Sequence, residues 1–222
     1  MIKIKKFPAR GFFLLSLLAA SLAFTGCGLW NNFTTYFNLY YNAERLFNES
    51  EQEIIQQKKN YFSIQDSRSI GNASGNLTKV IEKLSKLLQF NAQSAYVDDA
   101  LLMIGKSFFY QQDYQKALRK FTELISTAPN SDLVPQARFW IAKTELRLKN
   151  YTQAIAILDE LSAKALAVKD EEMLSQIYTE QVGYFMAIEK YNDAIVAARK
   201  LIEISGNDEL NAAAMFEIGR LN

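Results

Sequence analysis

The sequence has no histidine and a single cysteine among its 222 residues. Histidine is the commonest metal ligand and the usual general base near neutral pH, so Cys/His zinc sites, Ser/His/Asp triads and Cys/His pairs are excluded. The nine glycines are scattered and form no phosphate-binding loop. We therefore expect no catalytic residue, no metal and no cofactor, although the many Asp and Glu leave carboxylate chemistry open by composition alone.

After the first 26 residues, basic residues are fewer than acidic ones. Lys3, Lys5, Lys6 and Arg10 lie in that segment, which leaves 21 basic residues against 24 acidic ones and a net charge near −3. A surface that binds nucleic acid needs an excess of basic residues. We therefore expect no nucleic-acid partner.

The first residues, MIKIKKFPARGFFLLSLLAASLAFTGC, have the layout of a signal peptide. A basic start is followed by an apolar stretch over residues 11–24 that only serines interrupt. As a helix this stretch would be about 21 Å long, which is short for a bilayer core of about 30 Å. We predict that residues 1–26 are a signal peptide.

The only cysteine follows directly, and Thr25-Gly26-Cys27 resembles the lipobox of bacterial lipoproteins. The resemblance implies cleavage before Cys27 and a diacylglycerol on its sulfur, although Phe24 replaces the usual Leu. Several acyl chains together form a stable membrane anchor. Gly28, in place of Asp, implies an outer-membrane, periplasm-facing location. The alternatives are an ordinary secretory signal with an unrelated cysteine, or a short membrane anchor.

Residues 27–76 are expected to form an aromatic helix and a long loop. Aromatic residues recur at helical spacing in residues 33–47, and the pattern becomes polar toward Gln57. The aromatic stripe either packs on the first repeat or rests on a membrane surface or a partner. Residues 58–76 contain two glycines, four serines and three asparagines, which indicates a loop.

Internal repeats dominate residues 77–222. The clearest one places small residues where two helices would cross and large apolar residues between them, in the order Leu101-x2-Ile104-Gly105-x2-Phe108, Tyr114, Ala117-x3-Phe121 and Pro129. The pattern recurs with Ala154 and then Ala194 in the place of Ala117. These spacings of 37 and 40 residues exceed the ~34 of the standard repeat, so longer turns are expected.

The pattern resembles the tetratricopeptide-repeat family, whose motif has these gaps. The resemblance implies an all-α fold, a TPR α-solenoid in which antiparallel helix pairs form a right-handed superhelix. The expected units are a helix B at 77–91, repeats at about 98–131, 135–168 and 175–208, and a partial repeat at 212–222. Since no helix B follows that partial repeat, the chain is expected to be truncated.

With the lipobox, the whole chain is similar to periplasmic repeat lipoproteins typified by BamD, of the outer-membrane β-barrel assembly machine. It also resembles Bacteroidetes-type repeat lipoproteins of gliding motility and secretion. These resemblances imply a non-catalytic scaffold for protein or peptide partners in the envelope, held to the membrane by its N-terminal lipid. The alternative is the docking arm of an enzyme or wall-active protein whose catalytic domain lies beyond residue 222.

Family geometry assigns partner binding to helix-A positions outside the core, on the concave face. In the first two clear repeats these positions form a basic strip flanked by aromatics, comprising Lys106, Phe109, Tyr110, Phe139, Lys143 and Arg147. In the third repeat they are Thr179, Gly183 and Met186. Aromatic residues and arginine commonly anchor interfaces. The alternative is a solvated face on which Phe109 and Phe139 pack against neighbouring repeats.

Overall fold

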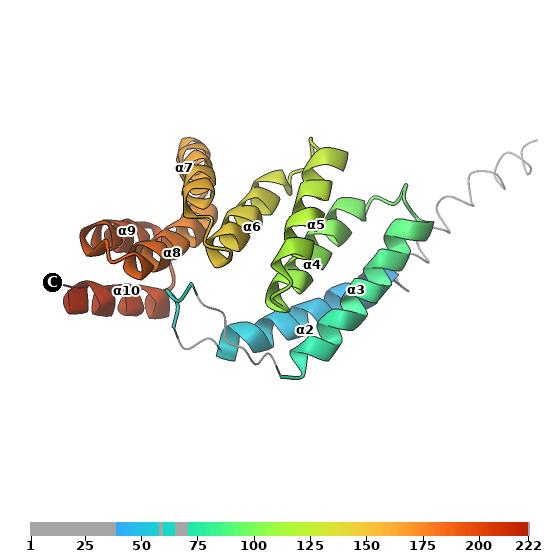
Figure 1. Ribbon diagram of the computed structural model, residues 1–222, viewed down its shortest axis with the longest axis horizontal. Helices are drawn as coiled ribbons and strands as arrows, with labels where there is room; N and C mark the ends of the chain where they lie inside the picture. Colours follow the sequence, from blue (N-terminus) through green and yellow to red (C-terminus); the bar gives the residue numbers. More distant parts are fainter. Residues whose placement is uncertain (1–38, 58–59, 65–70, 222) are drawn as a thin grey trace, which may run out of the picture.

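The computed structural model describes residues 39–57, 60–64 and 71–221, and within them the chain forms nine helices and no strand (Figure 1). The predicted signal peptide and Cys27 lie outside these residues. None of the described helices combines the length and apolarity that crossing a membrane requires. The helices are α2 (Tyr41–Gln57), α3 (Ala73–Phe90), α4 (Val97–Tyr110), α5 (Tyr114–Thr127), α6 (Val134–Arg147), α7 (Tyr151–Val168), α8 (Glu171–Ala187), α9 (Tyr191–Ile204) and α10 (Asp208–Leu221).

Each helix packs against the next one along the chain, and the predicted α-solenoid is confirmed. Three-residue turns join α4 to α5, α6 to α7 and α8 to α9. In each turn the middle residue, Gln112, Lys149 or Glu189, has a positive φ of 61–64°. Its amide donates to the carbonyl three residues back, and the next amide donates to the carbonyl five residues back. This left-handed C-cap is a Schellman motif, and its repetition turns the chain the same way in each pair.

Small residues lie at the helix crossings, as the repeat pattern predicts. Ala117, Ala154 and Ala194 are almost completely buried. A Cβ added to Gly105 would lie only 2.4 Å from Cε1 of Phe121, so the ring of α5 packs directly on the backbone of α4. These contacts bring the two helices of a pair close enough to share one apolar core.

The extra length of the repeats has two different origins. Between α5 and α6 a six-residue connection, residues 128–133, accounts for the first long spacing, as expected. The expectation of longer turns is wrong for the second spacing, because only residues 169–170 separate α7 from α8. There the helices themselves are longer, with 18 residues in α7 and 17 in α8.

Two helices begin earlier than the sequence pattern suggests. Helix α3 begins at Ala73, four residues before Leu77, although Ser74, Gly75 and Asn76 are poor helix formers. Ala73 is fully buried one turn before the buried Leu77, so packing outweighs propensity. Helix α10 begins at Asp208, where the preceding Asn207 accepts a hydrogen bond from the Leu210 amide.

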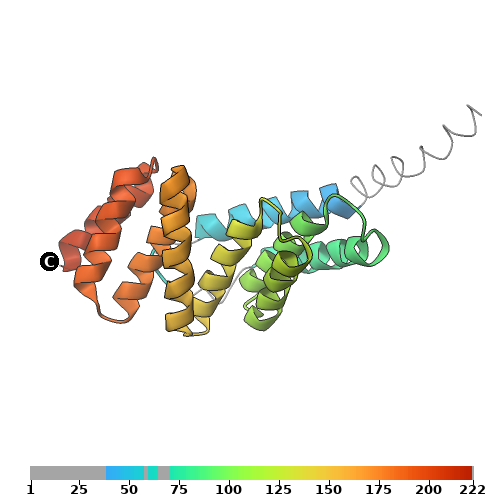
Figure 2. The same ribbon diagram turned by 90° about the horizontal axis from the view of Figure 1, so that it is seen from above.

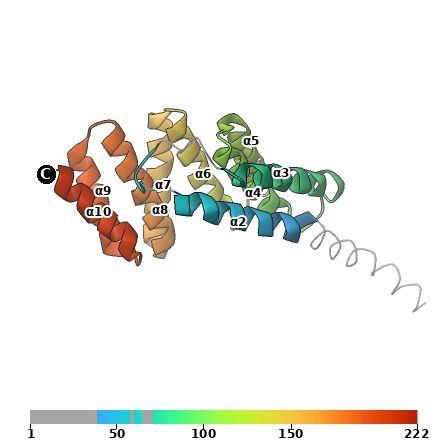
Figure 3. The same ribbon diagram turned by 90° about the horizontal axis from the view of Figure 1, so that it is seen from below.

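The helices form two rows. The even-numbered helices also contact each other, α2 with α4, α4 with α6 and α6 with α8, and they form the inner row of a curved array. Seen from above, α7 of the outer row lies in front and α2 lies behind (Figure 2). Seen from below, α2 crosses in front of the inner row (Figure 3). The concave surface that the sequence analysis expected is therefore the face of α4, α6 and α8.

Candidate functional site: the inner face of the repeats

The six residues predicted to line the groove lie together on α4 and α6, around an indole ring that the sequence analysis did not include. The Phe109 and Tyr110 rings meet Trp140 edge-on, with centroids 5.1 and 5.7 Å from it. The ammonium groups of Lys106 and Lys143 lie 5.1 and 5.0 Å from the Trp140 ring centroid. Trp140 was missed because it occupies the repeat position of Met103, one of the two residues between Leu101 and Ile104 that the motif leaves unspecified. Its place one turn before Lys143 was the available signal.

Two carboxylates from neighbouring inner helices pair with the predicted basic strip. On α2, Glu51 lies 2.7 Å from the Lys106 ammonium and accepts a 2.6 Å hydrogen bond from the Tyr110 hydroxyl. On α8, Glu180 lies 2.8 Å from both Lys143 and Arg147. The expected strip is therefore not a free basic surface. Glu51, Lys106, Lys143, Arg147 and Glu180 form a row of ion pairs that runs from α2 to α8. We call these five residues the inner ladder.

Burial differs sharply among the predicted groove residues. Phe109, Phe139 and the Arg147 side chain are only 1–3% exposed, whereas the Lys106 and Lys143 side chains are 13% and 17% exposed. The expectation that Phe109 and Phe139 flank an open groove is not met, because both rings belong to the main apolar core. The alternative, in which these rings pack against neighbouring repeats, describes their placement.

The charged groups of the inner ladder are largely shielded from water. Burial lowers the pKa of Lys106, Lys143 acts in the same direction, and the attraction of Glu51 opposes both. Among the residues that the structure describes, the carboxylates of Glu51 and Glu180 pair with Lys106, Lys143 and Arg147. Charged groups that are desolvated and mutually paired hold their geometry rigidly but offer little free charge to a ligand.

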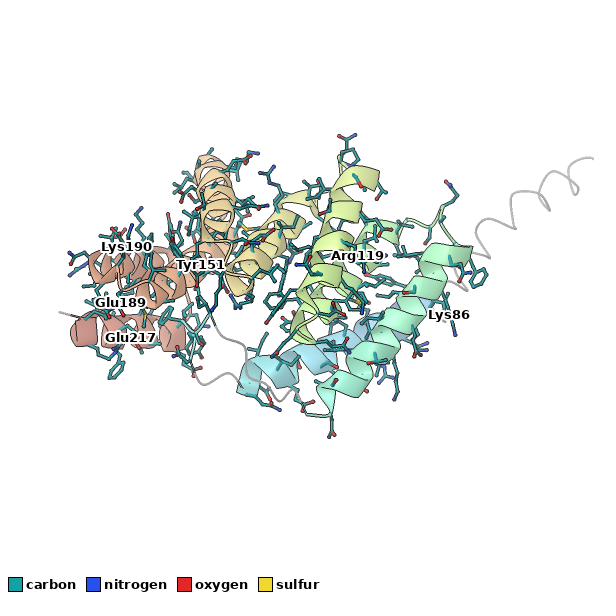
Figure 4. The ribbon with its side chains drawn as sticks, in the orientation of Figure 1. Lys86, Arg119, Tyr151, Glu189, Lys190 and Glu217 are labelled. Carbon is teal, nitrogen blue, oxygen red and sulfur yellow. The ribbon has the colours of Figure 1, made fainter. Side chains whose placement is uncertain are left out.

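The outer row also carries exposed cations. Figure 4 labels Lys86 on α3 and Arg119 on α5, and both side chains are exposed. The outer-row lysines Lys116 and Lys120 pair locally, with Asp113, which directly precedes α5, and with Glu123 of α5. Lys86 and Arg119 therefore serve as outer-face reference positions for charge changes on the inner face.

The repeat geometry, two helix rows with small residues at each crossing, agrees with a family comparison. The model of the tetratricopeptide repeat-like domain matches residues 13–205. This chain belongs to the tetratricopeptide repeat-like domain family. Scaffolds of this type are generally non-catalytic and act through protein–protein interaction. Among the described residues, no group of His, Cys, Asp and Glu side chains is arranged to hold a metal ion.

Two solved structures have a similar chain path. They are MamA residues 41–end from Desulfovibrio magneticus RS-1, with a TM-score of 0.44, and the MamA RS-1 ArsTM double mutant, with a TM-score of 0.46. Each is 15% identical to this chain over 82% of its length, and the match covers 94% and 96% of their own chains. No curated protein matches the chain.

In the third repeat of this tetratricopeptide array, the inner face is already covered by the chain itself. Residues 60–64, from the connection between α2 and α3, lie inside the curve beside α8 and α10 (Figures 1 and 3). Phe62 is 4% exposed and belongs to the main core. The predicted groove residue Gly183 lies beneath this segment. The sequence analysis treated residues 58–76 only as a loop and missed this contact.

Proposed function

We propose that this chain is a protein–protein interaction scaffold anchored by lipid in a bacterial cell envelope, at the outer membrane and facing the periplasm. One observation carries the proposal. A tetratricopeptide array follows an N-terminal segment whose only cysteine has the sequence surroundings of a lipidation site. The chain resembles BamD-type lipoproteins and the repeat lipoproteins of motility and secretion. These resemblances favour a role as a subunit of a β-barrel assembly, secretion or motility complex.

The partner-binding surface in this proposal is the half-buried edge of the inner ladder. Lys106, Tyr110 and Lys143 form the accessible part, while Phe109, Phe139 and Arg147 form its buried base. Because the cations of the inner ladder are already paired with Glu51 and Glu180, shape and apolar contact should dominate affinity. Electrostatic attraction mainly accelerates association and depends on salt. We therefore expect capture of partners to depend only weakly on ionic strength.

The anchor is tested by Cys27→Ser. The variant should accumulate as an unprocessed precursor and incorporate no labelled fatty acid, whereas the wild-type chain is labelled. Labelling that persists in Cys27→Ser would overturn the lipid anchor.

The binding face is tested by Lys143→Met, which removes the charge and retains most of the apolar stem. Native partners are captured from envelope extract with the anchored chain and identified by mass spectrometry. Lys143→Met should lose partners that the wild-type chain retains, while Lys86→Met on the outer row should lose none. Equal loss in both variants would exclude the inner ladder as the binding face.

A further inference from the structure

Residues 60–64, which we call the strap, make contacts with two helices far away in the sequence. The Asn60 side chain accepts a 2.9 Å hydrogen bond from the Phe62 amide and fixes the start of the strap. The Tyr61 hydroxyl faces the Glu209 carboxylate of α10, whose interaction with it raises the pKa of Tyr61. Phe62 is buried and belongs to the main apolar core, to which helices α4 to α10 contribute. The strap therefore fastens an N-terminal connection to the C-terminal part of the array.

The main chain of the strap also packs closely against the backbone of α8 at Gly183. A Cβ added to Gly183 would lie 2.4 Å from the Phe62 carbonyl oxygen and 3.1 Å from Cγ2 of Ile64. The absence of a side chain at Gly183 therefore lets the main chain of the strap rest directly on α8. Glycine inside a helix costs about 1 kcal/mol relative to alanine. The close approach of the strap therefore comes with a lower intrinsic helix stability at Gly183.

The repeat register shows that this glycine replaces a long side chain. Gly183 follows Lys143 by the same 40 residues that separate Ala154 from Ala194, and Lys143 follows Lys106 by 37. In the first two repeats the equivalent position carries a lysine of the inner ladder. In the third repeat the equivalent position has no side chain, so the backbone of α8 is accessible to the strap, and Phe62 is buried beside it.

We propose that the inner face of α8 and α10 is a binding site for an extended peptide of the form Tyr-Phe-x-Ile, and that the strap is its internal ligand. A partner segment with the same types of side chain binds to this site by displacing the strap. Its aromatic pair replaces Tyr61 and Phe62, its main chain crosses Gly183, and its aliphatic residue replaces Ile64. The apparent affinity for such a partner is reduced by the fraction of molecules in which the strap occupies the site. The inference rests on the proposed scaffold function and names one of its binding sites.

The probe is a capped peptide with the sequence Asn60–Ile64, carrying fluorescein on a flexible linker. Its binding to the full chain in detergent is measured by fluorescence anisotropy. Phe62→Ala removes the main anchor of the strap and should bind the probe at least tenfold more tightly than the wild-type chain. A second variant, in which a Gly/Ser sequence of equal length replaces residues 60–64, should behave in the same way. This variant leaves every helix sequence unchanged and so protects the test against a misfolded point variant.

Two controls define the site. Adding Gly183→Ala to the Gly/Ser variant should weaken probe binding at least tenfold, because the new methyl group occupies the place of the peptide carbonyl. A probe with alanine in the place of Phe62 should not bind. Absence of binding to a Gly/Ser variant with native helical content would overturn the proposal, and so would binding that Gly183→Ala leaves unchanged.

The outcome is separable from that of the scaffold proposal, because the probe assay requires no envelope partner. Probe binding with failed partner capture would leave the peptide site standing. Failed probe binding, with partner capture still lost in Lys143→Met, would remove the peptide site and leave the scaffold.

Discussion

At the level of single residues, Gly105 and Gly75 provide a matched pair of helical glycines. The Cβ of an alanine at position 105 would meet the Phe121 ring at 2.4–2.9 Å, whereas at position 75 no atom lies within 4 Å. Gly105→Ala should lower the free energy of unfolding by about 1–3 kcal/mol through overpacking. Gly75→Ala should leave it unchanged or raise it by up to about 1 kcal/mol through better helix propensity.

Urea unfolding midpoints of the two variants check this prediction. Similar midpoints for both would show that α4 and α5 do not cross at Gly105.

Lys106 should give the inner ladder a measurable pH dependence. Burial is the main reason that its pKa lies below the ordinary 10.5. The folded protein therefore loses this proton at lower pH than the unfolded chain, and the unfolded chain binds more protons between the two pKa values. Stability consequently rises with pH through that interval. The wild-type chain should gain stability relative to Lys106→Met as pH increases from neutral toward 10.5.

Urea midpoints of the wild-type chain and Lys106→Met, measured over this pH range, provide the test. A difference that stays constant would show that Lys106 titrates as it does in water, and a difference that moves in the opposite direction would show that folding raises its pKa.

At the level of helices, Glu180 joins α8 to α6. Its side chain is 6% exposed and holds Lys143 and the Arg147 guanidinium, which is 2% exposed. Glu180→Gln would remove a carboxylate that pairs with the buried Arg147 guanidinium, and breaking a buried ion pair typically destabilises a protein by about 3–5 kcal/mol. Glu49→Gln removes the partner of Arg45, an exposed pair within α2, and should cost less than about 1 kcal/mol.

Thermal unfolding of both variants gives the comparison. An effect of Glu180→Gln as small as that of Glu49→Gln would mean that water reaches the inner ladder between α6 and α8.

At the level of the whole molecule, the described helices contact mainly their neighbours in the array, and the strap adds a contact of longer range. In a solenoid, stability is approximately the sum of each unit and its interfaces with the next. A change in the strap should therefore act where the strap binds, and not along the whole array. Phe62→Ala should increase hydrogen exchange in α8 and α10 while α5 keeps its protection.

Hydrogen exchange followed by mass spectrometry measures each helix in the same experiment. Phe90→Ala, at a side chain 69% exposed on α3, is the matched control and should change no helix. Uniform loss of protection after Phe62→Ala would indicate that the array unfolds as one unit.

The sequence by itself determined the helices, their pairing and the repeat register. These follow from short-range rules, since apolar residues at helical spacing define a buried face and small residues such as Ala117 and Ala154 mark the crossings. It also placed the six predicted groove residues on two adjacent inner helices. Their positions repeat with the register, so the pattern of one repeat predicts the next.

The tertiary structure decided which of those residues remain accessible. Lys106 meets Glu51 across 55 positions of sequence, and Arg147 meets Glu180 across 33. Helical periodicity states which face a residue occupies, but it does not state which distant carboxylate will neutralise it. The strap shows the same limit, because its contact with Gly183 depends on how far the array curves back toward its own N-terminal connection. Curvature is the sum of many small helix rotations and therefore appears only when all the helices are packed together.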